Sequence, residues 1–167
     1  MDAQIILGAT AIGLGATLLT DLWNLCLKVF AGIPSLNLCL LGRWLLHMPG
    51  GAFMHRSIAA APGKRFECMV GRTAHYTIGI VLAFAFTAIV PGEWLVLPTL
   101  LPALLYGIAT VVFPLFIMQP AFGLGIAGVY TPKPAQTRLK SLMTHAVFGF
   151  GLWVCAVAMN LVWQVRP

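Results

Sequence analysis

The sequence predicts an all-α protein, an integral membrane bundle of four transmembrane helices with a short interfacial or re-entrant helix in the first cytoplasmic connection. Three observations predict this class. Hydrophobic residues make up 60% of the chain, charged residues 8%, and the mean hydropathy is +0.93, whereas a soluble domain carries roughly 25% charged residues. Four apolar runs are each about 20 residues long, enough to cross a bilayer as a helix. The basic residues fall between these runs. A soluble globular domain, a disordered chain and a disulfide-rich secreted domain are therefore excluded.

The four runs predict the spans directly. They cover residues 5–29, 73–90, 94–118 and 142–165, and the length of 167 residues fits one transmembrane domain over 1–167. The second run ends at Pro91-Gly92, which predicts a tight turn before the third. The third contains prolines, which bend or break a helix.

The positions of the basic residues predict the orientation. Two connections, 30–72 and 119–141, hold almost all of them, and Lys28 lies just before the first connection. Because loops rich in Lys and Arg stay on the cytoplasmic side, we expect both connections there and both termini outside. The nine residues on that side are Lys28, Arg43, Arg56, Lys64, Arg65, Arg72, Lys133, Arg138 and Lys140, and the tenth is Arg166.

The first connection contains a further apolar stretch, residues 36–48, bounded by Pro34 and Pro49. It is too short to span a bilayer. We therefore expect a short helix that lies on the membrane or dips into it as a re-entrant segment. The tract 119–129 is open to the same two interpretations, and the sequence does not choose between them for 34–48 or for 119–129.

Ionisable and polar residues lie inside the spans or at their ends. A charged side chain in a bilayer is costly unless it is paired or hydrated, so it is a functional hypothesis by default. At the rise of an α-helix, all four spans bring polar groups to the same cytoplasmic third. The sequence therefore predicts a cytoplasm-facing polar cluster there. Its candidate residues are Asp21, Asn24, Arg43, His47, His55, Arg72, His75, Tyr76, Gln119 and His145.

Several functions are compatible with this cluster. A purely structural interpretation pairs Asp21 with Arg72 or Lys28. His75 and His145 are the candidate metal ligands: they could hold haem b as two axial ligands, or a divalent metal together with Asp21. An oligomeric small-solute or proton-coupled transporter, a membrane-embedded enzyme with a histidine base, and an accessory subunit of a membrane complex are the alternatives. Whether the chain is an enzyme is left open.

Other sequence patterns limit the classes of molecule that the protein could bind. Ala9, Gly13 and Thr17 form a face of small residues that predicts tight helix contact, within the chain or in a homo-oligomer. No segment alternates basic and aromatic residues as a nucleic-acid platform would. The four cysteines form no C-x-x-C motif, which excludes covalent c-type haem attachment and a thioredoxin-like site. The expected partners are lipid, a further copy of the chain, or a membrane complex.

Eight short motifs extend over nearly the whole chain. They are Asp21-Leu-Trp, Pro34-Ser-Leu-Asn, Gly42-Arg-Trp, His55-Arg-Ser-Ile-Ala-Ala-Ala, Ala74-His-Tyr-Thr-Ile-Gly, Pro98-Thr-Leu-Leu-Pro-Ala-Leu, Met118-Gln-Pro and Ser141-Leu-Met-Thr-His-Ala-Val-Phe-Gly. In these motifs the chain resembles a family of small bacterial inner-membrane proteins that is defined only as a domain of unknown function. The resemblance implies a helical protein of the bacterial inner membrane and carries no activity. The motifs include several residues of the predicted cluster.

Overall fold

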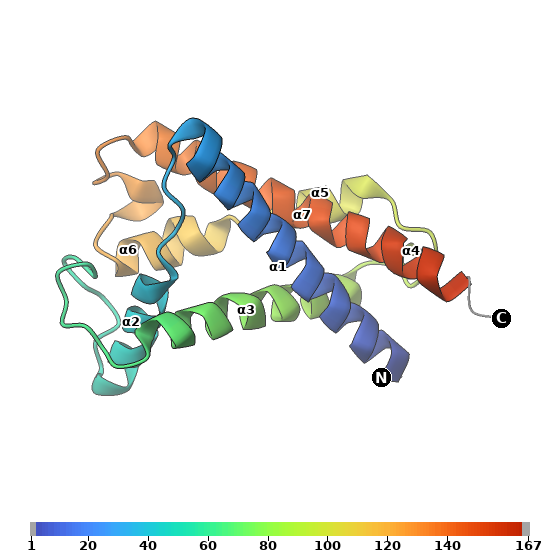
Figure 1. Ribbon diagram of the computed structural model, residues 1–167, viewed down its shortest axis with the longest axis horizontal. Helices are drawn as coiled ribbons and strands as arrows, with labels where there is room; N and C mark the ends of the chain where they lie inside the picture. The colour runs from blue at the N-terminus through green and yellow to red at the C-terminus, as the bar shows by residue number, and fades with distance from the viewer. Residues whose placement is uncertain (1–2, 165–167) are drawn as a thin grey trace. The chain divides into compact units, whose positions relative to one another are not determined.

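The computed structural model describes residues 3–164, and every regular element in this range is helical. Four helices are long and apolar enough to cross a membrane (Figure 1): Ile6–Ala31, Glu67–Ile89, Leu100–Ala121 and Pro134–Leu161. A short additional helix, α2 (Leu38–His47), occupies the apolar stretch of the first connection. The predicted fold class, an all-α membrane bundle of four spanning helices with one extra short helix, is confirmed.

The chain divides into two compact units. The first unit comprises Met1–Pro34, Tyr76–Ala109 and Thr144–Pro167, and the second comprises Ser35–His75 and Thr110–Met143. Two long helices, α3 (Glu67–Ile89) and α7 (Pro134–Gln164), contribute residues to both units. A single domain over 1–167 stays a prediction.

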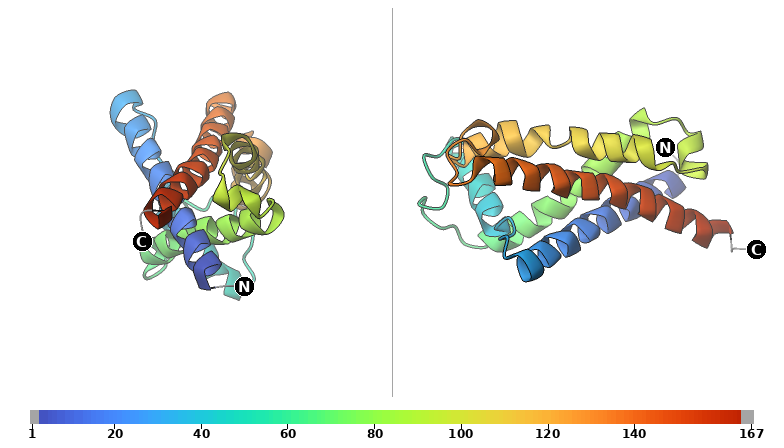
Figure 2. Two further views of the ribbon diagram at one scale, coloured as in Figure 1. Left: turned by 90° about the vertical axis from the view of Figure 1, so that its right-hand side faces the viewer. Right: turned by 90° about the horizontal axis from the view of Figure 1, so that it is seen from above.

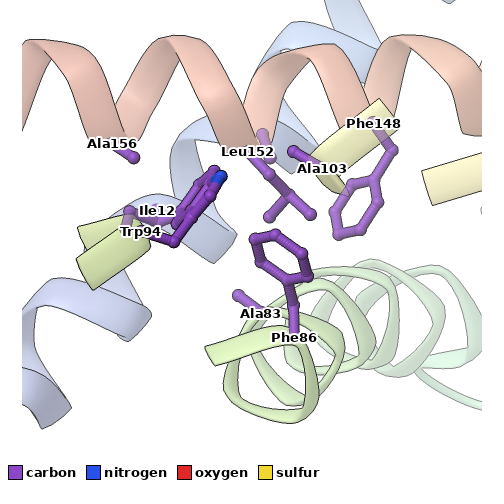
Figure 3. Packing of buried hydrophobic residues seen from close by; sticks show 9 residues of the cluster. Ile12, Ala83, Phe86, Trp94, Ala103, Phe148, Leu152 and Ala156 are labelled. Atoms are coloured by element: carbon purple, nitrogen blue, oxygen red, sulfur yellow. The ribbon is translucent and has the colours of Figure 1, made fainter. Parts of the chain in front are cut away.

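The first unit is built from helices around an apolar core (Figure 3). α1 (Ala3–Ala31), α4 (Glu93–Val96) and α5 (Leu100–Ala109) pack with the unit's parts of α3 and α7. Ile12, Phe86 and Leu152 are the largest fully buried side chains. Trp94 meets Phe86 edge to face, with ring centroids 4.7 Å apart, a favoured arrangement for aromatic pairs.

Small residues allow α1 and α3 to approach closely. A Cβ added to Gly13 would lie 2.7 Å from the Cα of Ile80, and one added to Gly79 would collide with the side-chain oxygen of Thr17. Ala9 and Thr17 are each 2% exposed. Gly13 and Thr17 of the small-residue face predicted on the first helix therefore pack within the chain, against α3.

α7 contacts its neighbours in the first unit through glycine as well. A Cβ on Gly107 of α5 would lie 2.5 Å from the backbone nitrogen of Gly149, and one on Gly151 would lie 2.8 Å from the Cα of Ala16. In membrane proteins, small residues of this kind allow backbones to pack by van der Waals contact where no hydrophobic effect draws helices together.

A short segment, residues 90–99, closes one end of the first unit. The indole of Trp94 donates to the Thr99 carbonyl at 2.9 Å, and the Trp153 indole donates to the Pro98 carbonyl at 3.2 Å. The Asn160 amide donates to the carbonyls of Leu95 and Val96 at 2.8 and 3.0 Å. Figures 1 and 2 show this segment at the end of the unit where α1 begins and α7 ends.

The second unit has a smaller core under an extended loop. Leu41, Ile58, Ala121 and Phe122 are buried together. The loop 51–66 is attached by two backbone hydrogen bonds, from His55 to the Ala121 carbonyl at 2.9 Å and from Ile58 to the Phe122 carbonyl at 3.1 Å. The unit's remaining short elements are η1 (Met48–Gly50), the π-helical η2 (Pro114–Met118), α6 (Gln119–Ala121) and η3 (Ile126–Gly128).

Several helices begin at other residues than the hydropathy runs do. α3 begins at Glu67 and α7 at Pro134, both earlier than expected, because a helix continues through polar turns that hydropathy does not register. α5 begins at Leu100, after Pro98, whereas the third span was expected from residue 94; Trp94 lies on the separate α4. The expected end of the fourth span, residue 165, lies outside the described residues.

Candidate functional site

In the first unit, a carboxylate on α1 meets a phenol on α3. The Tyr76 hydroxyl donates a hydrogen bond to Oδ2 of Asp21 at 2.9 Å, and both residues are partly buried. Each residue lies in a helix long and apolar enough to span a membrane. A hydrogen bond to an ionised carboxylate is worth about 1.5–3 kcal/mol. Asp21 and Tyr76, two members of the predicted cluster, are thus in direct contact.

The other polar side chains of this part of α1 bond to their own helix. Thr17 and Thr20 donate to the carbonyls of Gly13 and Ala16 at 2.7 and 2.9 Å. The Asn24 amide donates to the Thr20 carbonyl at 2.9 Å. Such bonds to the residue four positions earlier lower the cost of a polar group in an apolar helix without requiring a second helix.

His145 also belongs to the first unit. It is half-buried on α7, where a Cβ on Gly107 of α5 would lie 2.6 Å from its carbonyl oxygen. It therefore lies beside the close contact of α5 with α7.

In the second unit, Arg43 of α2 is tied to Glu67, the first residue of α3. Nη2 of Arg43 lies 2.7 Å from Oε1 of Glu67, and Nε lies 2.8 Å from Oε2, so the pair is bidentate. The hydrogen bond to Glu67 raises the pKa of Arg43 above its usual value. The backbone N–H of Lys64 also donates to Oε2 of Glu67 at 2.8 Å.

The same guanidinium organises the loop 51–66. Nη1 of Arg43 donates to the carbonyls of Ile58, Ala59 and Ala61 at 3.3, 3.1 and 3.0 Å. Arg43 thus holds the loop against α2. The observed geometry gives this candidate site residue a structural role.

His47 and His55 are brought together in the second unit. Their ring centroids are 5.1 Å apart, and the rings meet edge to face. Nε2 of His47 lies 3.0 Å from the Pro62 carbonyl oxygen. Both ring nitrogens of His55 are buried and have no hydrogen-bond partner in the described part of the chain. A buried polar atom without a partner costs free energy, so this side chain needs an explanation.

Gln119 is 4% exposed, on α6. Its amide nitrogen donates to the Ser141 hydroxyl at 3.3 Å, and its Oε1 has no hydrogen-bond partner among the described residues. The remaining candidates of this unit, Arg72 and His75, lie in the first turns of α3; Arg72 is exposed and His75 is half-buried. Whether all ten candidates share one site stays a prediction.

The sequence reasoning missed three residues of the second unit. Cys39 and Cys68 form a disulfide that joins α2 to α3, and Glu67 pairs with Arg43. Glu67 could have been found, because it is the single carboxylate in the connection 30–72. The disulfide could not, because its cysteines are 29 residues apart and follow no motif.

Glycines make the disulfide contact between α2 and α3 possible. A Cβ on Gly42 would collide with the carbonyl oxygen of Glu67, and a Cβ on Gly71 would collide with that of Leu38. The backbones of the two helices therefore touch beside the disulfide and the ion pair.

A metal site was one prediction for the cluster. In residues 3–164, no group of three or more His, Cys, Asp or Glu side chains is placed to hold a metal ion. Haem or metal ligation by His75 and His145 stays a prediction.

The helices and the intramembrane polar contact define a class: a small multi-spanning helical membrane protein with an apolar surface for lipid. The chain belongs to the family described as protein of unknown function DUF2938, whose model matches residues 10–159. No curated protein and no solved structure matches the chain significantly.

Proposed function

We propose that the protein lies in the bacterial inner membrane, with both termini outside and the connections 30–72 and 119–141 in the cytoplasm. The support is the charge distribution: nine of the ten basic residues lie in or next to these two connections. Basic loops remain on the cytoplasmic side because their translocation is disfavoured.

We further propose that the protein binds a small cationic or hydrogen-bond-donating solute, including the proton, at the Asp21–Tyr76 pair. The observation that carries this proposal is the carboxylate of one spanning helix hydrogen-bonded at 2.9 Å to the phenol of another. An ionisable side chain in a span is retained against a cost of several kcal/mol, and it usually marks a pathway or a binding site.

The chemistry of the two groups limits the ligand. An ionised carboxylate has about four acceptor sites, and the hydroxyl of tyrosine both donates and accepts. A donor or a cation can therefore bind at the carboxylate while the phenol orients it. Protonation of Asp21 would abolish its charge, so solute binding at this pair would be linked to proton binding.

The experiment uses the full chain purified in detergent from its native membrane. Optical spectroscopy and elemental analysis first establish whether haem or a metal co-purifies. Thermal stability is then measured against a panel of monovalent cations, amines and amino acids from pH 5 to 9, for the wild type, Asp21→Asn and Tyr76→Phe. Thr10→Ala is the control, because Thr10 lies on the same helix and bonds only its own helix in the structure, to the Ile6 carbonyl at 2.8 Å.

We expect at least one cation or amine to raise the melting temperature of the wild type and the Thr10 variant but not of Asp21→Asn. A Soret band or a stoichiometric metal that depends on His75 and His145 would replace this proposal by the redox or metal alternative. Identical responses of wild type and Asp21→Asn to every ligand and pH would overturn it.

A further inference from the structure

The Cys39–Cys68 disulfide of the second unit plays no part in the proposed solute site. It joins the second residue of α2 to the second residue of α3. Cys68 is exposed and Cys39 is half-buried. An attacking thiolate can therefore reach the sulfur of Cys68, which is the first requirement for thiol–disulfide exchange.

Both cysteines lie at helix N-termini. The positive end of the helix dipole favours negative charge and so stabilises a thiolate at this position. The first turn of α2 is ordered by Asn37, whose side chain accepts from the Cys39 N–H at 3.0 Å. A pair of stabilised thiolates favours the reduced form and makes a disulfide easier to reduce.

The nearest charges do not cancel this effect. Glu67 precedes Cys68, but its carboxylate is paired with Arg43, which lies one turn after Cys39 on α2. Lys64 and Arg65 come just before Glu67. Basic residues therefore adjoin Cys68 in the sequence, and the one carboxylate beside it is paired with Arg43.

The location of this disulfide in the cell decides its role. The inference rests on the proposed orientation, which puts the connection 30–72 in the cytoplasm. Thiols there are kept reduced, and disulfides that form in this compartment are transient, catalytic or redox-sensing. A permanent structural cross-link would require the opposite orientation.

We propose that Cys39–Cys68 is a redox-active disulfide that exchanges with a cytoplasmic dithiol protein. A thiolate of the dithiol attacks Sγ of Cys68, the Cys39–Cys68 bond breaks, and Cys39 leaves as a thiolate that takes up a proton. The second thiol of the reductant then attacks the mixed disulfide and releases Cys68. Two electrons and two protons pass to the protein, and the dithiol becomes a disulfide. In the reverse reaction, the disulfide form of the partner oxidises Cys39 and Cys68.

Reduction would change how the loop 51–66 is held. The disulfide closes the chain between residues 39 and 68, which includes α2 from its second residue onward and this loop. After reduction, the Arg43–Glu67 pair and the glycine contact still connect α2 with α3. The oxidised and reduced forms therefore differ in the covalent link between α2 and α3, which restrains the two ends of the segment that contains this loop.

The test measures the thiol state of the full-length protein in its native membrane. Cys26 and Cys155, the free cysteines, are replaced by Ala so that a maleimide gel shift reports Cys39 and Cys68 alone. Cells are acid-quenched before, during and after a pulse of diamide. The orientation is measured separately by labelling Lys64→Cys in a variant in which all four cysteines are replaced.

We expect both thiols to be labelled in untreated cells, loss of labelling during the pulse, and recovery afterwards. In the purified protein, a dithiol reductant lacking its second cysteine should be trapped on Cys68. A pair that stays oxidised in untreated cells while Lys64→Cys is labelled only from the cytoplasm would overturn the redox inference and leave the orientation standing. Labelling of Lys64→Cys from outside would overturn both, and thiols that diamide never oxidises would overturn the disulfide itself.

Discussion

The contact of Gly79 with Thr17 allows a direct test of how α1 and α3 are held together. A methyl group at residue 79 would occupy the position of the Thr17 hydroxyl, and Thr17 is only 2% exposed. Overpacking a buried contact costs about 1–3 kcal/mol. Replacing a helical glycine by alanine gains up to about 1 kcal/mol of helix propensity. We therefore expect Gly79→Ala to destabilise the protein by a net of up to about 2 kcal/mol.

A second substitution should remove this penalty. Thr17→Ala deletes the obstructing oxygen, and the next atoms, Cβ of Thr17 and the Gly13 carbonyl oxygen, would lie 3.2 and 3.4 Å from the new methyl group. Alone, Thr17→Ala loses only the hydroxyl bond to Gly13 at 2.7 Å, worth about 0.5–1.5 kcal/mol. The double variant should therefore be at least as stable as Thr17→Ala, with a favourable coupling equal to the overpacking cost, about 1–3 kcal/mol.

The assay is reversible unfolding of the purified protein in mixed micelles with increasing SDS, followed by tryptophan fluorescence. Gly92→Ala is the matched control, because a Cβ there meets nothing within 4 Å and its φ of −57° suits alanine. Loss of stability in the double variant equal to the sum of the two single losses would refute the steric reasoning. So would a Gly79→Ala variant that is more stable than the wild type.

Three further predictions concern the polar contacts and the cross-link. Tyr76→Phe should lower the free energy of unfolding by about 1.5–3 kcal/mol, because the Asp21 carboxylate loses this hydrogen bond; SDS titration measures the loss. Glu67→Gln should release the loop 51–66, because Arg43 loses its bidentate partner, and limited trypsin digestion should then cut faster after Lys64 and Arg65; unchanged cleavage would show that the carbonyl bonds of Arg43 suffice. Reduction with dithiothreitol should lower the free energy of unfolding by up to about 3.6 kcal/mol, the value expected for a disulfide that closes a loop across a separation of 29 residues. The stability of the Cys39→Ser variant should not change with dithiothreitol.

The four spans could be predicted from sequence because the membrane imposes a length and a composition on any helix that crosses it. Asp21 was predicted as a site residue for the same reason. Its partner was harder to predict: the structural alternative paired it with Arg72 or Lys28, while the structure records a hydrogen bond from Tyr76. From charge alone, a cation is the expected partner of Asp21. Which face of α3 meets Asp21, however, depends on how α1 and α3 are rotated about their axes.

That rotation is set by contacts which leave little trace in a sequence. Gly79 is one of 17 glycines, and only the structure shows that it faces the hydroxyl of Thr17. The same holds for Gly42 and Gly71, whose contact brings Cys39 to Cys68. Periodicity predicts which face of a helix is small or apolar, but the pairing of faces is a property of the packed chain.

The polar residues of α1 differ in where they find hydrogen-bond partners in an apolar environment. This difference separates structural from functional candidates. Thr17, Thr20 and Asn24 each donate a hydrogen bond to a carbonyl of their own helix, and these bonds need no neighbouring helix. No backbone carbonyl can satisfy an ionised carboxylate, because both groups only accept hydrogen bonds. An ionised Asp21 therefore needs a hydrogen-bond donor, and in the structure α3 supplies one, the Tyr76 hydroxyl. A residue that depends on a second helix in this way couples its protonation and its ligands to the packing of two spans. This dependence, rather than polarity alone, makes Asp21 the residue to test first.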